Sequence, residues 1–219
     1  MNPFHFNLPT EIHFTDDHFN DLKTALEKVA PTRILLVYGM HSLKTSGLYD
    51  GIIQVFNDLM IPYDEVSEVP ANPTLSKVYE AQALIQNNHH DFILAAGGGS
   101  VMDAAKAIAV SAFVSKEELW PIFKRERWFE KALSLGVFVT LSGTGSEVNG
   151  NSVINNDFEN VKWSIGDPLL RPKFAIINPA FQLGLKSDAF IATTLDIIHH
   201  TLEQYFEITK NTSTSDYLM

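Results

Sequence analysis

The amino-acid sequence predicts an α/β protein in which helices cover both faces of a parallel β-sheet. Short apolar segments such as Arg33–Tyr38 and Phe92–Ala96 alternate with segments of helical spacing such as Gly47–Met60. A short, uniformly apolar segment is typical of a strand buried on both faces, and strands that alternate with helices indicate parallel pairing. With 219 residues, 45% of them hydrophobic, the chain is long enough to bury a core of this kind.

The same alternation continues through the rest of the chain. We expect further strands at Tyr63–Val69, Val137–Leu141 and Phe174–Ile177, and helices at Leu75–Gln86 and Val101–Ala112. Thr74 is in position to cap the first of these two helices.

Two segments between these elements have a different character. Ser115–Lys131 is charged and aromatic, which indicates a surface helix or an excursion that Pro121 interrupts. Ser152–Asn155 and Val161–Ile165 are β-prone and flank a polar turn, so we expect a β-hairpin there.

The pattern changes near the C-terminus. Ser187–Ile208 is one long helix candidate, followed by the polar tail Asn211–Asp216, which places a domain boundary near Gln182–Lys186. The helix carries an apolar stripe with no evident cover, at Phe190, Ile191, Leu195, Ile198 and Leu202. Exposed stripes of this kind tend to find a partner, so we expect self-association, that is, a homo-oligomer.

Composition excludes several classes of function. The formal net charge of −10 disfavours nucleic acid as a partner, because an acidic surface repels phosphate backbones. The absence of cysteine excludes a disulfide scaffold, a zinc–thiolate site and a cysteine nucleophile, and it fits a cytoplasmic location. No secretory signal pattern opens the sequence, and no apolar segment reaches the ~18 residues of a membrane span, so no membrane partner is expected.

The strongest chemical signal is Gly97-Gly98-Gly99-Ser100, between the strand at Phe92–Ala96 and an alanine-rich helix. Glycines let the backbone approach a ligand, and a helix N-terminus offers free N–H groups and partial positive charge to a phosphate. A GGGS string alone is more often a linker or tight turn, but its place between strand and helix favours a phosphate cradle. It is neither the GxGxxG pattern nor a Walker loop.

Two more polar loops follow predicted strands, where open α/β sheets bind their ligands. Gly39-Met40-His41-Ser42 follows the first strand, and on its own it is a plain strand–helix turn. Thr140–Glu147 is dense in hydroxyls and glycines that can bind sugar and phosphate oxygens, although it is equally a Ser/Gly loop. Lys162 is a candidate cation beside a dinucleotide, whereas a lone lysine is usually a solvated surface residue.

The fourth signal is Asp196-Ile197-Ile198-His199-His200 in the long C-terminal helix. Residues four apart share a helix face, so Asp196 and His200 can point at one ion, whereas His199 faces elsewhere. A carboxylate with an imidazole suits Fe2+ or Zn2+, but such a pair is common by chance and provides fewer ligands than catalytic sites use.

These four signals, in this order, resemble the iron-containing (group III) alcohol dehydrogenases, most closely the butanol dehydrogenase-like branch. The supporting strings are LLVYGMHSLKTSGLYD, AAGGGSVMDAAKAIA, TLSGTGSEVNGNSVI and LDIIHHTLEQY, and the resemblance runs from about Phe4 to Leu218. It implies that residues 1–184 form a dinucleotide-binding α/β domain and that residues 185–219 begin a helical metal-binding domain that is incomplete here.

The resemblance also implies a role for each candidate residue. Gly97, Gly98, Gly99 and Ser100 would hold the pyrophosphate of NAD(P)(H), with Asp103 just inside the following helix. Gly39 and Ser42 would lie near the adenosine end of the cofactor. Family members commonly carry Gly-Gly-Gly-Ser at that loop, so Met40 and His41 leave the choice between NAD and NADP open.

The other candidates belong to the reactive end of the cofactor and to the metal. Thr140, Leu141, Thr144, Ser146 and Asn149 would line the nicotinamide and ribose side. Asn72 would sit beside the cofactor, and Lys162 would reach its ribose. Asp196 and His200 would be the catalytic residues, as the first two ligands of Fe2+ or Zn2+.

The resemblance implies hydride transfer between the nicotinamide and a short-chain alcohol or aldehyde. Family chains continue into a helical domain that supplies two more histidine ligands, and this sequence contains only its first helix. Two alternatives therefore remain open: an inactive dinucleotide-binding module, and a glycerol dehydrogenase-like polyol dehydrogenase, although the Asp196-to-His200 spacing favours the butanol dehydrogenase-like branch.

Overall fold

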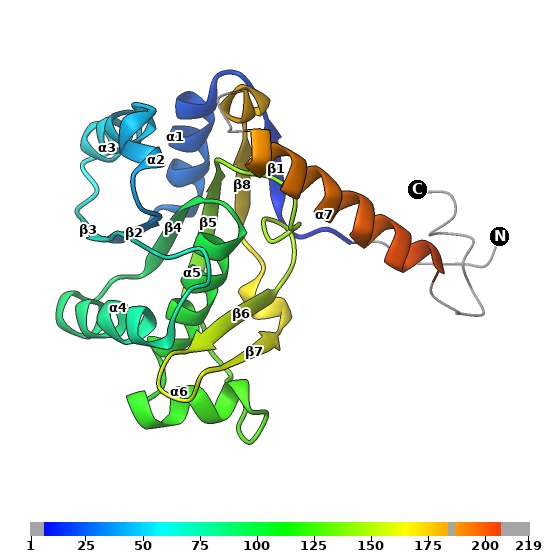
Figure 1. The fold of residues 1–219 in the computed structure, drawn as a ribbon. Helices are drawn as coiled ribbons and strands as arrows, with labels where there is room; N and C mark the ends of the chain where they lie inside the picture. Colours follow the sequence, from blue (N-terminus) through cyan, green and yellow to red (C-terminus); the bar gives the residue numbers. More distant parts are fainter. Residues whose placement is uncertain (1–6, 184–186, 207–219) are drawn as a thin grey trace.

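The computed structural model describes residues 7–183 and 187–206 of the chain. Its centre is a six-stranded sheet of order β1-β8-β5-β4-β2-β3, in which every neighbouring pair is parallel (Figure 1). The strands are β1 (Glu11–Phe14), β2 (Ile34–Tyr38), β3 (Tyr63–Val66), β4 (Phe92–Gly97), β5 (Ser134–Val139) and β8 (Phe174–Ile177). The predicted parallel α/β sheet is confirmed.

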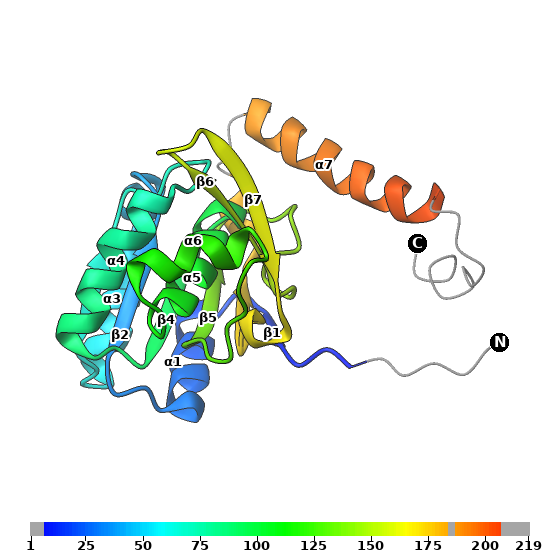
Figure 2. The same ribbon diagram turned by 90° about the horizontal axis from the view of Figure 1, so that it is seen from below.

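Two hydrophobic cores lie on opposite faces of this sheet, because successive side chains of a strand point to opposite faces. In β2, Leu35 and Val37 belong to one core, whereas Leu36 and Tyr38 belong to the other. The first core is completed by α4 (Leu75–Asn88), α5 (Gly99–Ser111) and α6 (Lys116–Phe123), and the second by α1 (His18–Val29), α2 (Ser42–Thr45) and α3 (Leu48–Asp58) (Figures 1 and 2).

Two elements near the N-terminus go beyond the predicted set. β1 pairs with β8 at the edge of the sheet, and α1 buries Leu22, Ala25 and Leu26 against the second core. These three residues have the i, i+3, i+4 spacing of a helix, so a signal for α1 exists in the sequence. For β1 the signal is weak, because Ile12 and Phe14 remain 45% and 72% exposed.

Helix α6 confirms the helix expected within Ser115–Lys131 but corrects its placement on the surface and its interruption at Pro121. Its capping box is formed by Ser115 and Glu118, whose carboxylate accepts from the Ser115 N–H at 2.9 Å. Leu119, Trp120, Ile122 and Phe123 are buried in the first core, and Pro121 lies within the helix. The charged residues around these apolar positions are what made the segment look like surface.

The predicted hairpin is confirmed as β6 (Asn151–Asn156) paired antiparallel with β7 (Val161–Gly166). It forms a second, separate sheet that lies over α5, where the Ser152 hydroxyl donates to the Asp103 carbonyl at 2.6 Å. The short 3-10 helices η1 (Pro168–Leu170) and η2 (Pro179–Gln182) precede and follow β8.

The predicted C-terminal helix is present as α7 (Ser187–Phe206), which extends away from the sheet (Figures 1 and 2). The stripe residues are exposed: Phe190 54%, Ile191 54%, Leu195 59%, Ile198 48% and Leu202 46%. The predicted boundary at Gln182–Lys186, the predicted helix end at Ile208 and the polar tail fall partly or wholly outside the described residues. Among the helices that the structure describes, none is long and apolar enough to cross a membrane.

The amino ends of β2 and β4 are joined by Asp91. Its carboxylate accepts from the Thr32 N–H at 2.9 Å, the Thr32 hydroxyl at 2.7 Å and the Arg33 N–H at 3.0 Å. Burial raises the pKa of Asp91, but the hydrogen bonds from Thr32 and Arg33 outweigh it and hold this pKa below its ordinary value. Asp91 therefore stabilises the fold above the pKa of an unfolded aspartate, and this contribution is lost as the pH falls through the lower folded-state pKa.

We expect Asp91→Asn to lower the free energy of unfolding by about 1 kcal/mol at pH 7, since a partly exposed carboxylate is partly replaced by water. The difference from the unsubstituted protein should shrink as the pH falls below about 4. Urea denaturation across this pH range measures both effects, with Asp16→Asn at an exposed carboxylate as control. An equal loss at every pH would contradict the assignment to the charged form.

Candidate cofactor site

The three predicted ligand loops meet at one edge of the sheet. β5, β4 and β2 are neighbours and parallel, so the loops that follow them lie at the same carboxyl edge. β5 ends at Val139 rather than at Leu141, which leaves Thr140 and Leu141 in the loop. A cavity of about 560 Å³ opens there, lined by six of the predicted residues, namely Gly39, Ser42, Gly97, Gly98, Thr140 and Leu141.

Helix α5 points its N-terminus at this edge. It begins at Gly99, two residues before the predicted start, with Gly98 as its N-cap. In the part of the chain that the structure describes, the Gly99 and Ser100 N–H groups donate no hydrogen bond to a backbone carbonyl outside α5. Free amides and the positive end of a helix are the elements that bind a phosphate or diphosphate.

The glycines of this loop are required by close packing. An ideal Cβ on Gly97 would lie 2.5 Å from Val101 Cγ2, and one on Gly99 would lie 2.7 Å from Thr144 Oγ1. Gly98 is less tight, because its Cβ would lie 3.1 Å from Leu141 Cβ and a small shift of Leu141 would relieve the contact. Gly39 differs, since its Cβ would meet nothing closer than 3.7 Å. The close approach of β4, α5 and the loop after β5 thus depends on residues 97 to 99, whereas the packing around position 39 does not require glycine.

Three further predicted residues gather at the start of α5. The Ser100 hydroxyl donates to the Ala71 carbonyl, and the neighbouring Asn72 accepts from Lys162 Nζ at 3.1 Å. The loop before α4 and the strand β7 are thereby held next to the helix N-terminus. Lys162 adds a positive charge at this exposed position, where an anionic ligand would benefit from it.

The remaining cofactor candidates surround a buried lysine. Lys106 is 0% exposed, and its Nζ donates to Ser146 Oγ at 2.7 Å and to Asn149 Oδ1 at 3.1 Å. The Ser146 hydroxyl in turn donates to Asp103 Oδ1 at 2.9 Å. Burial raises the pKa of Asp103, an effect that the Ser146 hydrogen bond and the Lys106 charge only partly offset. Asp103, Ser146 and Asn149 are therefore brought together, because these hydrogen bonds join them directly or through Ser146 to the buried Lys106.

Sequence reasoning assigned no role to Lys106, although a signal for it exists. Its neighbours from Ala104 to Val110 are buried, so α5 is apolar on all sides and lies wholly within the core. A lysine inside such a helix cannot reach water and must find buried acceptors.

The two predicted metal ligands lie on one face of α7. His200 Nε2 is 3.6 Å from Asp196 Oδ1, whereas the His199 and His200 rings are 6.2 Å apart. Within residues 7–183 and 187–206, no group of three or more His, Cys, Asp or Glu side chains is placed to hold a metal. The pair thus provides two ligands for an Fe2+ or Zn2+ site, which usually takes three or more from the protein.

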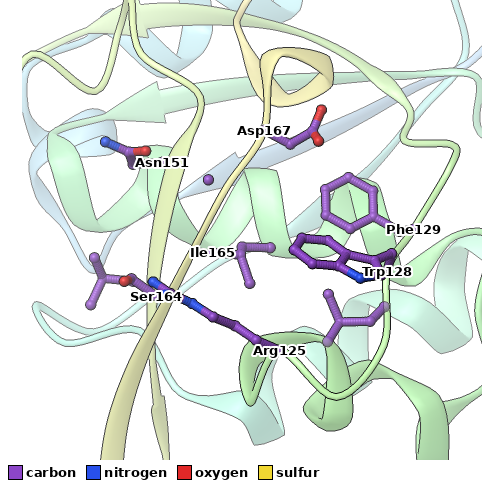
Figure 3. Close-up of a pocket in the computed structure, with 10 residues that line it drawn as sticks. Arg125, Trp128, Phe129, Asn151, Ser164, Ile165 and Asp167 are labelled. Carbon is purple, nitrogen blue, oxygen red and sulfur yellow. The ribbon is translucent and has the colours of Figure 1, made fainter.

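A second cavity of about 440 Å³ lies between the α6 region and the hairpin, and its lining includes none of the predicted site residues (Figure 3). Trp128 and Phe129 line it from the loop after α6, and the Arg125 side chain points toward Ser164 of β7. Local sequence patterns do not reveal this cavity, because its walls come from segments about 30 residues apart.

A six-stranded parallel sheet with helices on both faces and a cavity at its carboxyl edge defines a Rossmann-like α/β protein. The sequence model of the family described as "Iron-containing alcohol dehydrogenase" matches residues 9–179. The chain therefore belongs to the iron-containing alcohol dehydrogenase family.

Individual relatives agree with this assignment. The chain is 36% identical over 216 residues to the probable NADH-dependent butanol dehydrogenase 1 of Bacillus subtilis (strain 168), covering 99% of this chain and 55% of that protein. It is 29% identical to an NADPH-dependent aldehyde reductase of Escherichia coli (strain K12), covering 94% of this chain and 52% of the relative.

Among solved structures, the NADH-dependent butanol dehydrogenase A of Thermotoga maritima matches with a TM-score of 0.93 and 34% identity, covering 99% of this chain and 54% of that one. The predicted resemblance and fold are confirmed. The chain spans about half the length of the relatives it matches.

Proposed function

We propose that this chain forms the dinucleotide-binding part of a metal-dependent, NAD(P)-linked alcohol dehydrogenase or aldehyde reductase. The reaction would be hydride transfer between the nicotinamide and a short-chain alcohol or aldehyde. The observation that carries the proposal is that the loops after β2, β4 and β5 line one shared cavity, in a chain that belongs to this family. The names of the relatives support both NADH and NADPH, so the proposal leaves the coenzyme open.

The residues of this chain would bind and orient the cofactor. The N–H groups of Gly99 and Ser100 would donate to the pyrophosphate, with Gly97 and Gly98 allowing its close approach. Gly39 and Ser42 would contact the adenosine end, and the cavity accommodates both because the loops after β2 and β4 are adjacent. The cofactor itself supplies the hydride.

The reactive end of the cofactor would lie along the loop after β5. Two of its residues, Thr140 and Leu141, line the cavity, and a third, Thr144, lies against Gly99. From these positions they would face the nicotinamide and its ribose. Asn72 would sit beside the cofactor, and Lys162, which donates to Asn72 Oδ1 at 3.1 Å, would reach the ribose.

Asp196 and His200 would hold the metal as two of its ligands, and a metal at this position would act as a Lewis acid toward the substrate oxygen. Helix α7 passes close to the loop after β5, since a Cβ on Gly143 would lie 3.3 Å from Thr193 Cβ. This proximity supports a site near the reactive end of the cofactor. The exposed apolar stripe of α7 supports self-association.

A second candidate function is an inactive dinucleotide-binding module. It is favoured by the metal site, for which the described residues provide only two ligands. The two candidates make the same prediction for cofactor binding and opposite predictions for turnover.

The deciding experiment is anaerobic oxidation of NADH and NADPH by the purified chain with butanal, after loading with Fe2+ or Zn2+. Under the enzyme proposal, Asp196→Ala and His200→Ala should each abolish turnover, whereas His199→Ala should retain it because that ring faces elsewhere. Activity that survives both substitutions would contradict the assigned metal ligands. Absence of turnover at every metal loading, with NADH still bound, would establish the binding module instead.

A further inference from the structure

We propose that Lys106 is a positioning residue for the dinucleotide: its buried ammonium fixes the loop 144–151 and thereby sets how Ser146 and Asn149 meet the nicotinamide end. This inference rests on the proposed function and deepens it, because Lys106 would act through two residues that it binds, Ser146 and Asn149.

The first argument is the number of acceptors gathered on one nitrogen. Besides Ser146 Oγ and Asn149 Oδ1, Lys106 Nζ donates to the Ser146 carbonyl at 2.8 Å and the Asn151 carbonyl at 2.9 Å. Three N–H groups thus serve four acceptors, all in the segment between residues 146 and 151. Hydrogen bonds from an ammonium are stronger and shorter than neutral ones, so they restrict this segment at both of its ends.

The second argument is the charge balance around Lys106. Asp103 lies one helical turn earlier on α5 and is linked to the ammonium through the Ser146 hydroxyl. Its other oxygen accepts from the Val153 N–H at 3.3 Å, which extends the network into β6. Burial lowers the pKa of Lys106 to about 8, with the Asp103 and Glu147 charges opposing this effect, so the ammonium persists at pH 7. Because an acidic partner balances its charge, Lys106 acts on the cofactor through geometry rather than through long-range attraction.

The third argument is the hydrogen bonding within the loop 144–151 itself. Its internal hydrogen bonds are all local: the Val148 and Asn149 N–H groups donate to the Gly145 carbonyl at 3.2 Å, the Ser146 N–H to Thr144 Oγ1 at 3.3 Å and the Asn151 N–H to Asn149 Oδ1 at 2.9 Å. These bonds join residues at most four apart and shape single turns, whereas the bonds from Lys106 hold both ends of the segment 146–151 to α5. The opposite end of the cofactor depends less on this loop, because the α5 N-terminus is built from residues 97 to 100 and meets the loop at Thr144, outside the segment 146–151 that Lys106 binds.

The test compares NADH with ADP, which lacks the nicotinamide riboside. In Lys106→Met we expect the Kd for NADH, measured by its fluorescence, to rise at least about tenfold, while the Kd for ADP changes by less than about twofold. Amide hydrogen exchange of residues 144–151 should accelerate in the same variant. Lys106→Arg keeps the buried charge but cannot gather four acceptors on one nitrogen, so it should show the same selective loss at smaller amplitude.

Gln82→Met is the matched control. Gln82 is 2% exposed and donates to the Ser111 and Val114 carbonyls at 2.8 Å each, at the far end of α5. It should lower stability without changing the ratio of the two dissociation constants or the exchange of the loop.

Equal weakening of NADH and ADP in Lys106→Met, or the same selective loss in Gln82→Met, would overturn the inference. If the unsubstituted chain binds neither NADH nor ADP, the proposed function fails. Hydrogen exchange then still decides whether Lys106 fixes the loop: unchanged exchange in both Lys106 variants would overturn that step as well.

Discussion

Substitution of Gly97 by alanine is expected to raise the Kd for NADH at least about 100-fold, which corresponds to ~2.7 kcal/mol. The added methyl would lie 2.5 Å from Val101 Cγ2 and 2.7 Å from Val101 Cβ, inside normal contact distance. Val101 lies in the first turn of α5, so relief of this contact must move the helix N-terminus away from β4. The N–H groups of Gly99 and Ser100 would then no longer point at the pyrophosphate position.

A second substitution, which removes part of the contact with Val101, provides the control. Val101→Ala removes the two Val101 methyl groups, including Cγ2, but keeps the Cβ at 2.7 Å, so Gly97→Ala combined with Val101→Ala should recover only part of the lost affinity, while Val101→Ala alone should have a small effect. A double-mutant cycle with NADH fluorescence measures this coupling. Undiminished NADH binding in Gly97→Ala would show that the dinucleotide does not use the α5 N-terminus.

The largest effect on stability is expected at Gly150. A Cβ at this position would lie 2.1 Å from the Asp167 carbonyl oxygen and 2.9 Å from its carbon. The obstacle is backbone rather than a rotatable side chain, and the Asp167 N–H also donates to the Gly150 carbonyl at 3.1 Å. Gly150→Ala must therefore separate the two chain segments where β6 begins and β7 ends. We expect a loss of about 3 kcal/mol or more in the free energy of unfolding.

Urea denaturation measures this loss. Gly39→Ala is the matched substitution, because its Cβ would make only ordinary contacts at 3.7 and 3.8 Å, so its stability should change little. Similar losses in the two variants would mean that alanine in place of glycine, rather than the contact with Asp167, causes the effect.

Much of the sheet could be predicted from local patterns. β2, β4 and β8 are short and almost entirely buried, and a strand covered on both faces requires an uninterrupted apolar segment such as Ile34–Tyr38. The loop at Gly97–Ser100 was recognisable for a related reason, since close packing of β4, α5 and the β5 loop excludes side chains there. These features follow from residues that are neighbours in the sequence.

Other features were misjudged or missed because exposure in the folded state does not follow local composition. The segment Lys116–Phe123 looks charged, yet four of its residues enter the core, while β1 pairs at the sheet edge with its apolar residues Ile12 and Phe14 exposed. The roles of the predicted cofactor and metal residues remain predictions, although the structure brings them together in groups.

By itself, the sequence determined the α/β class, the alternation of strands and helices, and the glycine and hydroxyl loops that carry the family resemblance. Only the tertiary structure decided the pairing of β1 with β8, the second cavity beside α6, and the environment of Lys106. The physical reason is separation along the chain: Lys106 is about 40 residues from Ser146 and Asn151, and their contact exists only because the hairpin packs across α5. A buried ammonium and its acceptors are specified together by that packing, so neither segment reveals the other when it is considered alone.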